Sequence, residues 1–527
     1  MKTLASSRRA SSRATSPVRA GKRSTNGHGE TSSPSPVVSP HVADWLSKPR
    51  QNLINGRWVG AASGKTFDVF NPADGSRIAR VAEGGAEDIN RAVAAARRAF
   101  DSGPWAAMTP REKGKMLWRI GDLILANGDE LAELESLDNG KPRAVARVAD
   151  IPLAADLFHY MAGWATKIEG NTIPLSIPNA HFHAYTLREP VGVVGQIIPW
   201  NFPLLMAAWK LGPALAAGNC VVLKPAEQTP LTALRLGELL LQAGMPDGVV
   251  NIVNGFGETA GAALAAHQEV DKVAFTGSTE VGKIIVRAAA GNLKKVSLEL
   301  GGKSPNIVFK DAGNLEAAIH GAASAIFFNH GQCCCAGSRL MVERDIFDTV
   351  VSGVAEHARK IKLGPGLDAK TEMGPLVSAE QLERVTNYMN QGKQAGACYV
   401  TGGSRKGNRG YFVEPTVVKG VNSKMSIVRE EIFGPVVVAE SFTGVEELVT
   451  RANQTQYGLA AGIWTRDVSK AHRIAAALKA GTVWGNCYNI FDSALPFGGY
   501  KQSGWGREMG HEVLEQYTET KAVVIGL

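Results

Sequence analysis

The chain has 527 residues, of which 44% are hydrophobic and 20% are charged. It is too long for one hydrophobic core of ordinary size, so we expect two or three domains. No run of eighteen or more apolar residues is present, and the amino terminus lacks the charged, apolar and small-residue order of a secretory signal. These features argue against a membrane span and against secretion.

The net charge of +8 is concentrated at the amino terminus. Residues 1–40 hold seven basic side chains and one acidic side chain, whereas the remainder carries 50 basic and 48 acidic residues. A nearly neutral body argues against a nucleic-acid partner. Residues 1–40 are rich in Ser, Arg and Pro, which predicts a disordered basic tail. We expect a cytoplasmic protein; the alternative is the mitochondrial matrix, with this tail as a transit peptide.

The first half of the body predicts strands, then helices, then a parallel sheet. Residues 53–72 have the pattern of strands and turns, and helical periodicity follows in residues 86–100 and in one long stretch from Pro110 to about Leu137. After Val191 come four short apolar runs, each followed by a turn and a helical pattern: "VGVVGQIIPW", "NCVVLKPA", "GVVNIVNG" and "VDKVAFTG". Such runs are buried on both faces, which predicts the doubly wound arrangement that binds nucleotides at the carboxyl ends of its strands.

A second alternation of strands and helices begins after Lys303 and predicts a second α/β domain. Its apolar runs include "SPNIVF", "RLMVER", "PVVVAESF" and "AGIWT". Two more segments, "HFHAYTLREP" and the closing "TETKAVVIGL", have the pattern of strands but no partner nearby in the sequence. Segments of this kind often pair across a subunit boundary.

Two glycine-rich turns lie where the predicted sheet would bind phosphate. The turn at residues 254–261, "NGFGETAG", departs from G-x-G-x-x-G by one extra residue. In "FTGSTEVGK", Gly277 and Ser278 end a strand and open a helix whose backbone N–H groups could bind a pyrophosphate. Ile284 stands where a Walker A loop needs Ser or Thr for magnesium, which disfavours an ATPase. For either turn, the alternative is a connection that needs glycine only for its backbone.

Half of the cysteines are consecutive, in "GQCCCAGSR". The six cysteines are Cys220, Cys333, Cys334, Cys335, Cys398 and Cys487. They form no C-x-x-C pair, so the sequence indicates neither a disulfide framework nor a zinc site, and a reducing compartment fits best. A thiol near a helix terminus or a positive group becomes a nucleophile suited to carbonyl carbon. The alternative is packing, the usual role of a buried cysteine.

Two polar residues are candidates for catalysis. Glu299, between leucines in "SLELGGKSPN", would have a raised pKa in an apolar setting, as a general base for water needs. The alternative is a surface carboxylate on an alternating strand. Asn201, in "IIPWNFPLLM", could stabilise an oxyanion through its amide, or could instead cap the next helix.

Seven segments together resemble the NAD(P)-dependent aldehyde dehydrogenase superfamily: "PWNFP", "KPAEQTP", "FTGSTEVG", "LELGGKSPN", "NHGQCCCAGSR", "REEIFGPV" and "PFGGYKQSGWGRE". They occur in the family's order and spacing, from about Asn52 to the carboxyl terminus. The resemblance implies an α/β fold with a modified Rossmann cofactor domain (residues 41–170 and 191–301). It further implies a second α/β catalytic domain (302–515) and a small β oligomerisation element (171–190 and 516–527) of a homo-oligomer.

The resemblance also assigns roles to individual residues. Cys334 matches the nucleophile, Glu299 the base, and Asn201 an oxyanion donor that works with the backbone N–H of Cys334. The implied NAD-binding residues are Lys224, Glu227, Gly277, Ser278, Glu431, Phe433, Trp200 and Ile198. The implied substrate pocket consists of Phe202, Met206, Trp209, Cys333, Cys335, Phe491 and Phe497. No metal is implied.

The implied reaction is attack of the Cys334 thiolate on an aldehyde, hydride transfer to nicotinamide, and hydrolysis of the thioester by water that Glu299 deprotonates. Glu227 would repel a 2′-phosphate, which favours NAD over NADP. The aromatic pocket favours an apolar aldehyde, and "NCYNIFDSALPFGGYKQSGWGREMG" is similar to bacterial phenylacetaldehyde dehydrogenases. Retinal-like and aliphatic aldehydes stay open. The rivals are a non-catalytic member of the fold and a coenzyme A-acylating dehydrogenase, which Glu299 disfavours.

Overall fold

The computed structural model describes residues 38–527, which form one compact unit. The predicted basic tail lies outside the described residues except for its last three positions. Helix α1 (Pro40–Ser47) already begins there, and Ser39 caps it by accepting a hydrogen bond from the Val42 N–H at 3.4 Å. No helix within residues 38–527 is both long and apolar enough to cross a membrane.

The first large sheet has eight strands, of which the five central ones are parallel. Across the sheet the order is β19 (Gly504–Trp505), β11 (Lys295–Glu299), β10 (Lys272–Thr276), β7 (Val193–Ile197), β8 (Cys220–Lys224), β9 (Val250–Ile252), β1 (Asn52–Ile54) and β2 (Arg57–Val59). The strand order therefore reverses between β7 and β10. In doubly wound folds this switch point, at the carboxyl ends of the strands, is where nucleotides bind.

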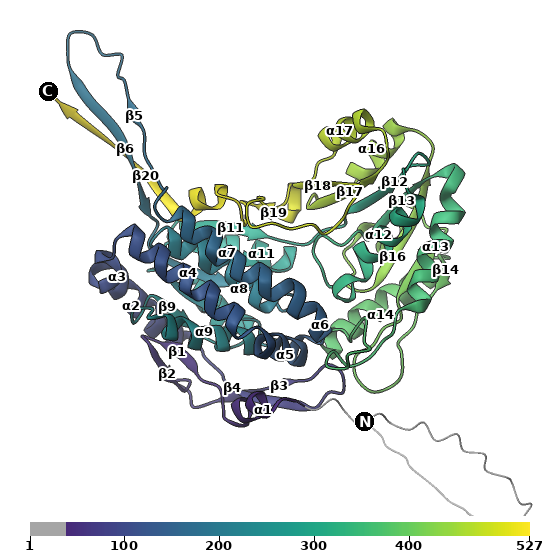
Figure 1. Cartoon of the computed structure of the whole chain (residues 1–527), viewed down its shortest axis with the longest axis horizontal. Coiled ribbons are helices and arrows are strands. Elements are labelled where there is room, and N and C mark those ends of the chain that lie inside the picture. Colours follow the sequence, from purple (N-terminus) through teal and green to yellow (C-terminus); the bar gives the residue numbers. More distant parts are fainter. Residues whose placement is uncertain (1–37) are drawn as a thin grey trace, which may run out of the picture. The chain divides into compact units, whose positions relative to one another are not determined.

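Helices cover this sheet because its central strands are buried on both faces. Those that contact its strands most are α2 (Ala86–Ser102), α8 (Pro203–Ala216), α9 (Leu231–Ala243) and α11 (Thr279–Ala289). The same part of the chain also contains α3 (Pro104–Ala107), α4 (Pro110–Ala126), α5 (Gly128–Asn139), α6 (Arg143–Val145), α7 (Ile151–Trp164) and α10 (Ala262–Ala266). Helices α4, α7 and α8 lie side by side (Figure 1).

The stretch from Pro110 to about Leu137, predicted to be helical, forms two consecutive helices, α4 and α5, which are separated at Asn127. The Asn127 side chain donates a hydrogen bond to the carbonyl of Leu123 at 2.8 Å, and α5 starts at the next residue, Gly128. Asparagine side chains compete with the helical hydrogen bonds in this way, and glycine disfavours helix continuation.

The second large sheet has seven strands, all parallel except the edge strand β14. Across the sheet the order is β14 (Cys398–Thr401), β15 (Thr416–Lys419), β16 (Val436–Phe442), β13 (Arg339–Glu343), β12 (Pro305–Val308), β17 (Ala460–Trp464) and β18 (Thr482–Gly485). The accompanying helices are α12 (Leu315–Phe327), α13 (Phe347–Lys360), α14 (Ala379–Gln394), α15 (Ser426–Arg429), α16 (Val445–Asn453) and α17 (Val468–Ala477). The alternation after Lys303 thus forms a sheet of its own.

The two strands without local partners pair with each other. Strand β20 (Thr518–Gly526) runs antiparallel to β6 (Phe182–Pro190) along its whole length, and β5 (Thr172–Ile173) pairs with the other edge of β6. This small sheet projects away from the two large ones (Figure 1). A separate hairpin joins β3 (Thr66–Phe70) to β4 (Arg77–Ala82).

Candidate active site

A cavity of about 560 Å³ lies where loops of the first sheet meet loops of the second. From the first sheet it is lined by the residues that follow β7, β10 and β11; from the second, by the cysteine triplet and by segments around Glu431 and Tyr488. The predicted site residues in its lining are Cys334, Glu299, Asn201, Gly277, Ser278, Glu431, Phe433, Trp200, Phe202, Met206, Trp209, Cys333, Cys335, Phe491 and Phe497. Ile198, Lys224 and Glu227 lie outside the lining.

The cysteine triplet is held in a tightly packed loop. Cys333 and Cys335 are buried, with their sulfur atoms 3.4 Å apart, whereas Cys334 is partly exposed. The Tyr488 hydroxyl donates to the Cys335 carbonyl at 2.8 Å, and a Cβ at Gly302 would lie 2.3 Å from the Cys334 carbonyl oxygen. Of the three thiols, the middle one is therefore the most accessible.

The Cys334 thiol is poorly acidic in this setting. Hydrogen bonding with Cys333 and burial raise its pKa well above the ordinary value, and the negative charge of Glu299 raises it further. The three thiols lie so close that ionisation of one opposes ionisation of the others. Because only the thiolate is nucleophilic, attack on a carbonyl requires a base that removes this proton.

Glu299 ends β11 and is 7% exposed, so the alternative of a surface carboxylate is wrong. Neither carboxylate oxygen has a hydrogen-bond partner among residues 38–527. Burial raises the pKa of Glu299 well above its ordinary value and Glu508 raises it further, while Lys210 and Arg507 oppose the shift. A carboxyl group with a raised pKa and unused oxygens suits a general base.

Asn201 is buried beside the cysteine loop, and its side chain does not cap helix α8, so that alternative is also wrong. Its amide nitrogen donates to the Gln332 carbonyl at 3.0 Å, immediately before the triplet. This bond uses one of two N–H groups and ties the amide to the nucleophile loop. An amide fixed in this way can act as a preorganised oxyanion donor.

The cofactor candidates supply the groups that a dinucleotide needs. Ser278 caps α11, its hydroxyl accepting from the Val281 N–H at 3.2 Å, so the helix N-terminus faces the cavity edge beside Gly277. Helix N-termini bind phosphate through free N–H groups and the helix dipole. Lys224 donates to Glu227 at 2.8 Å, and Ile198 donates its N–H to the Lys224 carbonyl at 3.2 Å. The residues present thus fit NAD.

Glu431 and Phe433 approach from the second sheet. Glu431 accepts the Gly302 N–H at 2.9 Å, and burial raises its pKa to about 7. Phe433 has a left-handed backbone (φ 59°), which is rare for a bulky residue and typical of functional sites. Its ring meets Trp200 edge-on with centroids 5.2 Å apart.

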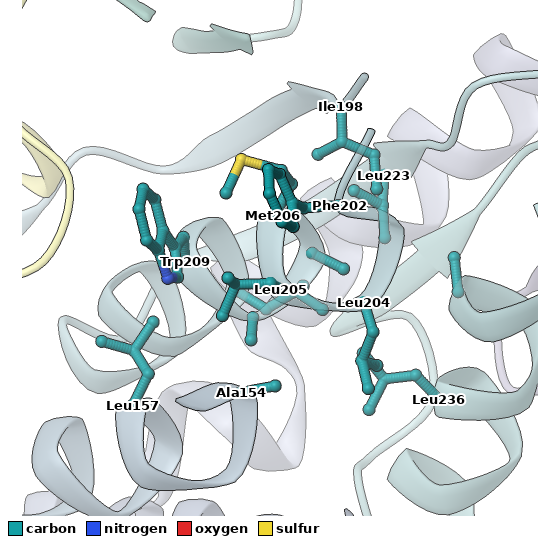
Figure 2. Close-up of a cluster of buried hydrophobic side chains, with 14 of the residues drawn as sticks. Ala154, Leu157, Ile198, Phe202, Leu204, Leu205, Met206, Trp209, Leu223 and Leu236 are labelled. Carbon is teal, nitrogen blue, oxygen red and sulfur yellow. The ribbon is translucent and has the colours of Figure 1, made fainter. Parts of the chain in front are cut away.

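The remaining wall of the cavity is aromatic. Met206 and Trp209 lie on α8 and Phe202 immediately precedes it, with Ala154 and Leu157 of α7 below them in the view of Figure 2. Trp209 and Phe497 have ring centroids 5.6 Å apart, and so do Phe491 and Phe497. These contacts form an apolar, largely aromatic surface on this side of the cavity.

Sequence reasoning missed several residues at this site. Asp150, Leu153, Phe328, Gln381, Arg384 and Tyr488 also line the cavity. Behind it, the Lys210 ammonium donates to the Glu508 carboxylate, and both side chains are nearly fully buried. No local pattern identifies most of these residues. The exception is Lys210, because a charged residue within the apolar sequence of α8 indicates a buried charge that needs a partner.

The sheet order and the cavity define a nucleotide-binding α/β enzyme with a cysteine beside its cofactor site. The sequence profile of the aldehyde dehydrogenase family matches residues 58–523. The mitochondrial benzaldehyde dehydrogenase of Antirrhinum majus is 53% identical over 476 residues, which is 90% of this chain and 88% of the relative.

Solved structures of aldehyde dehydrogenases are also similar to this chain. An NAD+ complex of aldehyde dehydrogenase from Bacillus cereus has a TM-score of 0.91 at 53% identity, covering 93% of this chain and 99% of the other. A variant of AldA, the indole-3-acetaldehyde dehydrogenase of P. syringae, in complex with NAD+ and IAA, has a TM-score of 0.90 at 46% identity, covering 92% and 98%. The chain belongs to the aldehyde dehydrogenase family and is an NAD-dependent aldehyde dehydrogenase.

Proposed function

We propose that this enzyme oxidises an apolar aromatic aldehyde, such as phenylacetaldehyde, to the carboxylic acid through a thioester on Cys334. The observation that carries the proposal is one cavity lined by Cys334, Glu299 and Asn201 and walled by aromatic side chains. Asn201 and Cys334 line the same cavity, and the Asn201 amide donates to the Gln332 carbonyl, two residues before Cys334.

The side chains divide the chemistry among them. Glu299, which lines the same cavity, takes the proton from the Cys334 thiol and so gives the thiolate that attacks the carbonyl. The Asn201 amide and the Cys334 N–H stabilise the negative oxygen of the tetrahedral intermediate. Glu299 then releases the thiol proton to solvent, and after the thioester forms it deprotonates the attacking water. The carboxylic acid leaves as the C–S bond breaks, and the Cys334 thiolate takes the proton back from Glu299 to regenerate the thiol.

NAD supplies the hydride acceptor when bound. Ser278 and Gly277 at the start of α11 would hold the pyrophosphate, Lys224 and Glu227 the adenosine ribose, and Glu431 the nicotinamide ribose. Trp200, Ile198 and Phe433 would pack around the cofactor. The negative charge of Glu227 would repel a 2′-phosphate, which gives the preference for NAD over NADP.

The substrate proposal depends on the pocket wall. Five predicted wall residues are apolar and four of them are aromatic: Phe202, Met206, Trp209, Phe491 and Phe497. Two relatives bear the names of enzymes for aromatic aldehydes, benzaldehyde and indole-3-acetaldehyde. An aliphatic or retinal-type aldehyde is the second candidate, because the wall itself carries no group that would reject it.

NADH formation with a panel of aldehydes tests the proposal. We expect kcat/KM for phenylacetaldehyde and benzaldehyde to exceed that for propanal and retinal, with no requirement for coenzyme A. A higher value for propanal or retinal would overturn the aromatic assignment, and dependence on coenzyme A would overturn hydrolysis. Mass spectrometry of enzyme quenched during turnover should place the acyl group on Cys334.

We further propose a homo-oligomer formed through the β20–β6–β5 sheet, in the cytoplasm or, if residues 1–40 act as a transit peptide, the mitochondrial matrix. Leu187, Val524 and Ile525 expose 40%, 54% and 47% of their surface on this sheet, and exposed apolar patches commonly mark interfaces. Light scattering of the full chain and of a chain shortened before Thr518 would test the assembly: loss of the oligomer supports it, and an unchanged mass contradicts it.

A further inference from the structure

Three consecutive residues before the cysteine triplet have left-handed backbones. Asn329, His330 and Gly331 have φ angles of 48°, 60° and 67°. Side chains disfavour this conformation, although asparagine tolerates it better than most residues. Gly331 is required, because a Cβ there would lie 2.1 Å from the Gly434 carbonyl oxygen. Such backbone persists only where its surroundings enforce it, and it concentrates at functional sites.

The Asn329 side chain in this turn connects two loops of the site. Its amide nitrogen donates to two carbonyls, that of Asn201 at 3.0 Å and that of Gln332 at 3.1 Å. Asn329 is 5% exposed, so these bonds are shielded from water. One buried amide therefore joins the loop after β7 to the loop that carries the nucleophile.

The same two loops meet a second time at the Gln332 carbonyl. That oxygen also accepts the side-chain N–H of Asn201 at 3.0 Å. Asn139 at the end of α5 supports the arrangement from the other side by donating to the Trp200 and Asn201 carbonyls at 2.8 and 3.3 Å. The Asn201 carbonyl is thus held by the side-chain amides of Asn329 and Asn139, while the Asn201 side chain donates to the Gln332 carbonyl, which the Asn329 amide also binds.

We propose that Asn329 is a positioning residue that sets the place of the Asn201 amide relative to the Cys334 sulfur. The inference rests on the proposed roles of Asn201 and Cys334. Asn329 does not line the cavity within the described chain, so it acts through Asn201 and not on substrate. A displacement of about 1 Å in a reacting constellation costs about a hundredfold in rate, which is the size of effect expected here.

Two substitutions test the proposal. Asn329→Asp keeps the shape but removes the donor, and Asn329→Gly removes the amide while accepting the left-handed backbone without strain. We expect each to lower kcat by about a hundredfold with NAD binding unchanged. Asn251→Asp is the matched control, because Asn251 is also buried and donates to two carbonyls, those of Val221 and Gly248, away from the cavity.

A double-substitution cycle separates positioning from general stabilisation. If Asn329 acts through Asn201, Asn329→Gly should have little further effect on kcat in an Asn201→Ala background. A merely structural role would give multiplicative losses, as we expect for Asn251→Asp combined with Asn201→Ala.

Three results would overturn the inference: normal kcat in both Asn329 variants, equal losses in Asn329→Asp and Asn251→Asp, or multiplicative losses in the cycle. Failure of the underlying proposal is distinguishable from these. Full activity of Asn201→Ala, or of Cys334→Ala, would remove the roles on which Asn329 depends, whatever the Asn329 variants do.

Discussion

The sharpest single test of the chemistry is Glu299→Gln. This change keeps the size of the side chain but removes the only function that a general base needs, an ionisable oxygen. Glutamine should be accommodated, because the Glu299 oxygens have no hydrogen-bond partner within residues 38–527 that the change would break. The variant therefore alters the chemistry of the group with little change in packing.

The magnitude follows from the two roles of this carboxyl group. General base catalysis contributes about 100-fold to 10,000-fold to a rate. Glu299 is proposed for thiol activation and for water activation, and the slower of the two sets the steady state. We expect deacylation to be the step that suffers most, because water is much less acidic than a thiol. Acyl-enzyme should then accumulate.

The pH dependence has a defined sign. The pKa of Glu299 is raised above its ordinary value near 4.5, chiefly by burial, so the active carboxylate forms only as the pH rises through that raised pKa. The wild-type rate should climb in this window, and the Gln variant should lack the climb. The same shift makes the buried carboxyl stabilising below the unfolded pKa and less so as the pH rises. The melting temperature of Glu299→Gln should therefore rise relative to that of the wild type as the pH increases.

Rapid-mixing measurement of NADH is the assay. Glu299→Gln should show a burst of NADH near one equivalent per active site followed by a slow steady state. The matched control is Glu133→Gln, which also replaces a buried carboxylate (3% exposed) but lies outside the cavity lining. A Glu299→Gln enzyme with an unchanged steady-state rate, no burst and the wild-type pH profile would refute the assignment.

Three further predictions follow from the same geometry. Cys334→Ala should abolish turnover and leave NAD binding intact, and substantial residual NADH formation would contradict the assignment. Glu227→Gln should raise the ratio of NADP to NAD kcat/KM by at least about fivefold, since one like charge near a phosphate costs about 1 kcal/mol or more; an unchanged ratio would disprove this role. Lys141→Met should lower the free energy of unfolding in urea by about 3–5 kcal/mol, because it strands the buried carboxylates of Glu135 and Asp150, which lie 3.1 and 2.8 Å from its ammonium. A loss below about 1 kcal/mol would contradict this prediction, because it would equal the contribution of an ordinary surface ion pair.

Much of the fold can be predicted from local patterns in the sequence. Strands β7, β8, β9 and β10 coincide with short apolar runs in the sequence. A strand that is covered on both faces has apolar residues at nearly every position, because neither face meets water. The glycine turn at Gly277 and the triplet around Cys334 are equally local, and both line the cavity. Each of these signals depends on residues within a few positions of one another.

Other features depend on what the tertiary structure brings together. The sequence around Glu299 fits a surface carboxylate as well as a buried base, and only the covering loops bury it. The pairing of β6 with β20 joins positions well over 300 residues apart, and the ion pair between Lys210 and Glu508 joins positions 298 residues apart. The periodicity of apolar residues predicts which side chains are buried, but it does not predict which residues far away in the sequence they contact. The strand pattern was thus determined by the local sequence, whereas the burial, pKa values and partners of the polar side chains were decided by the packing of one sheet's loops against the other's.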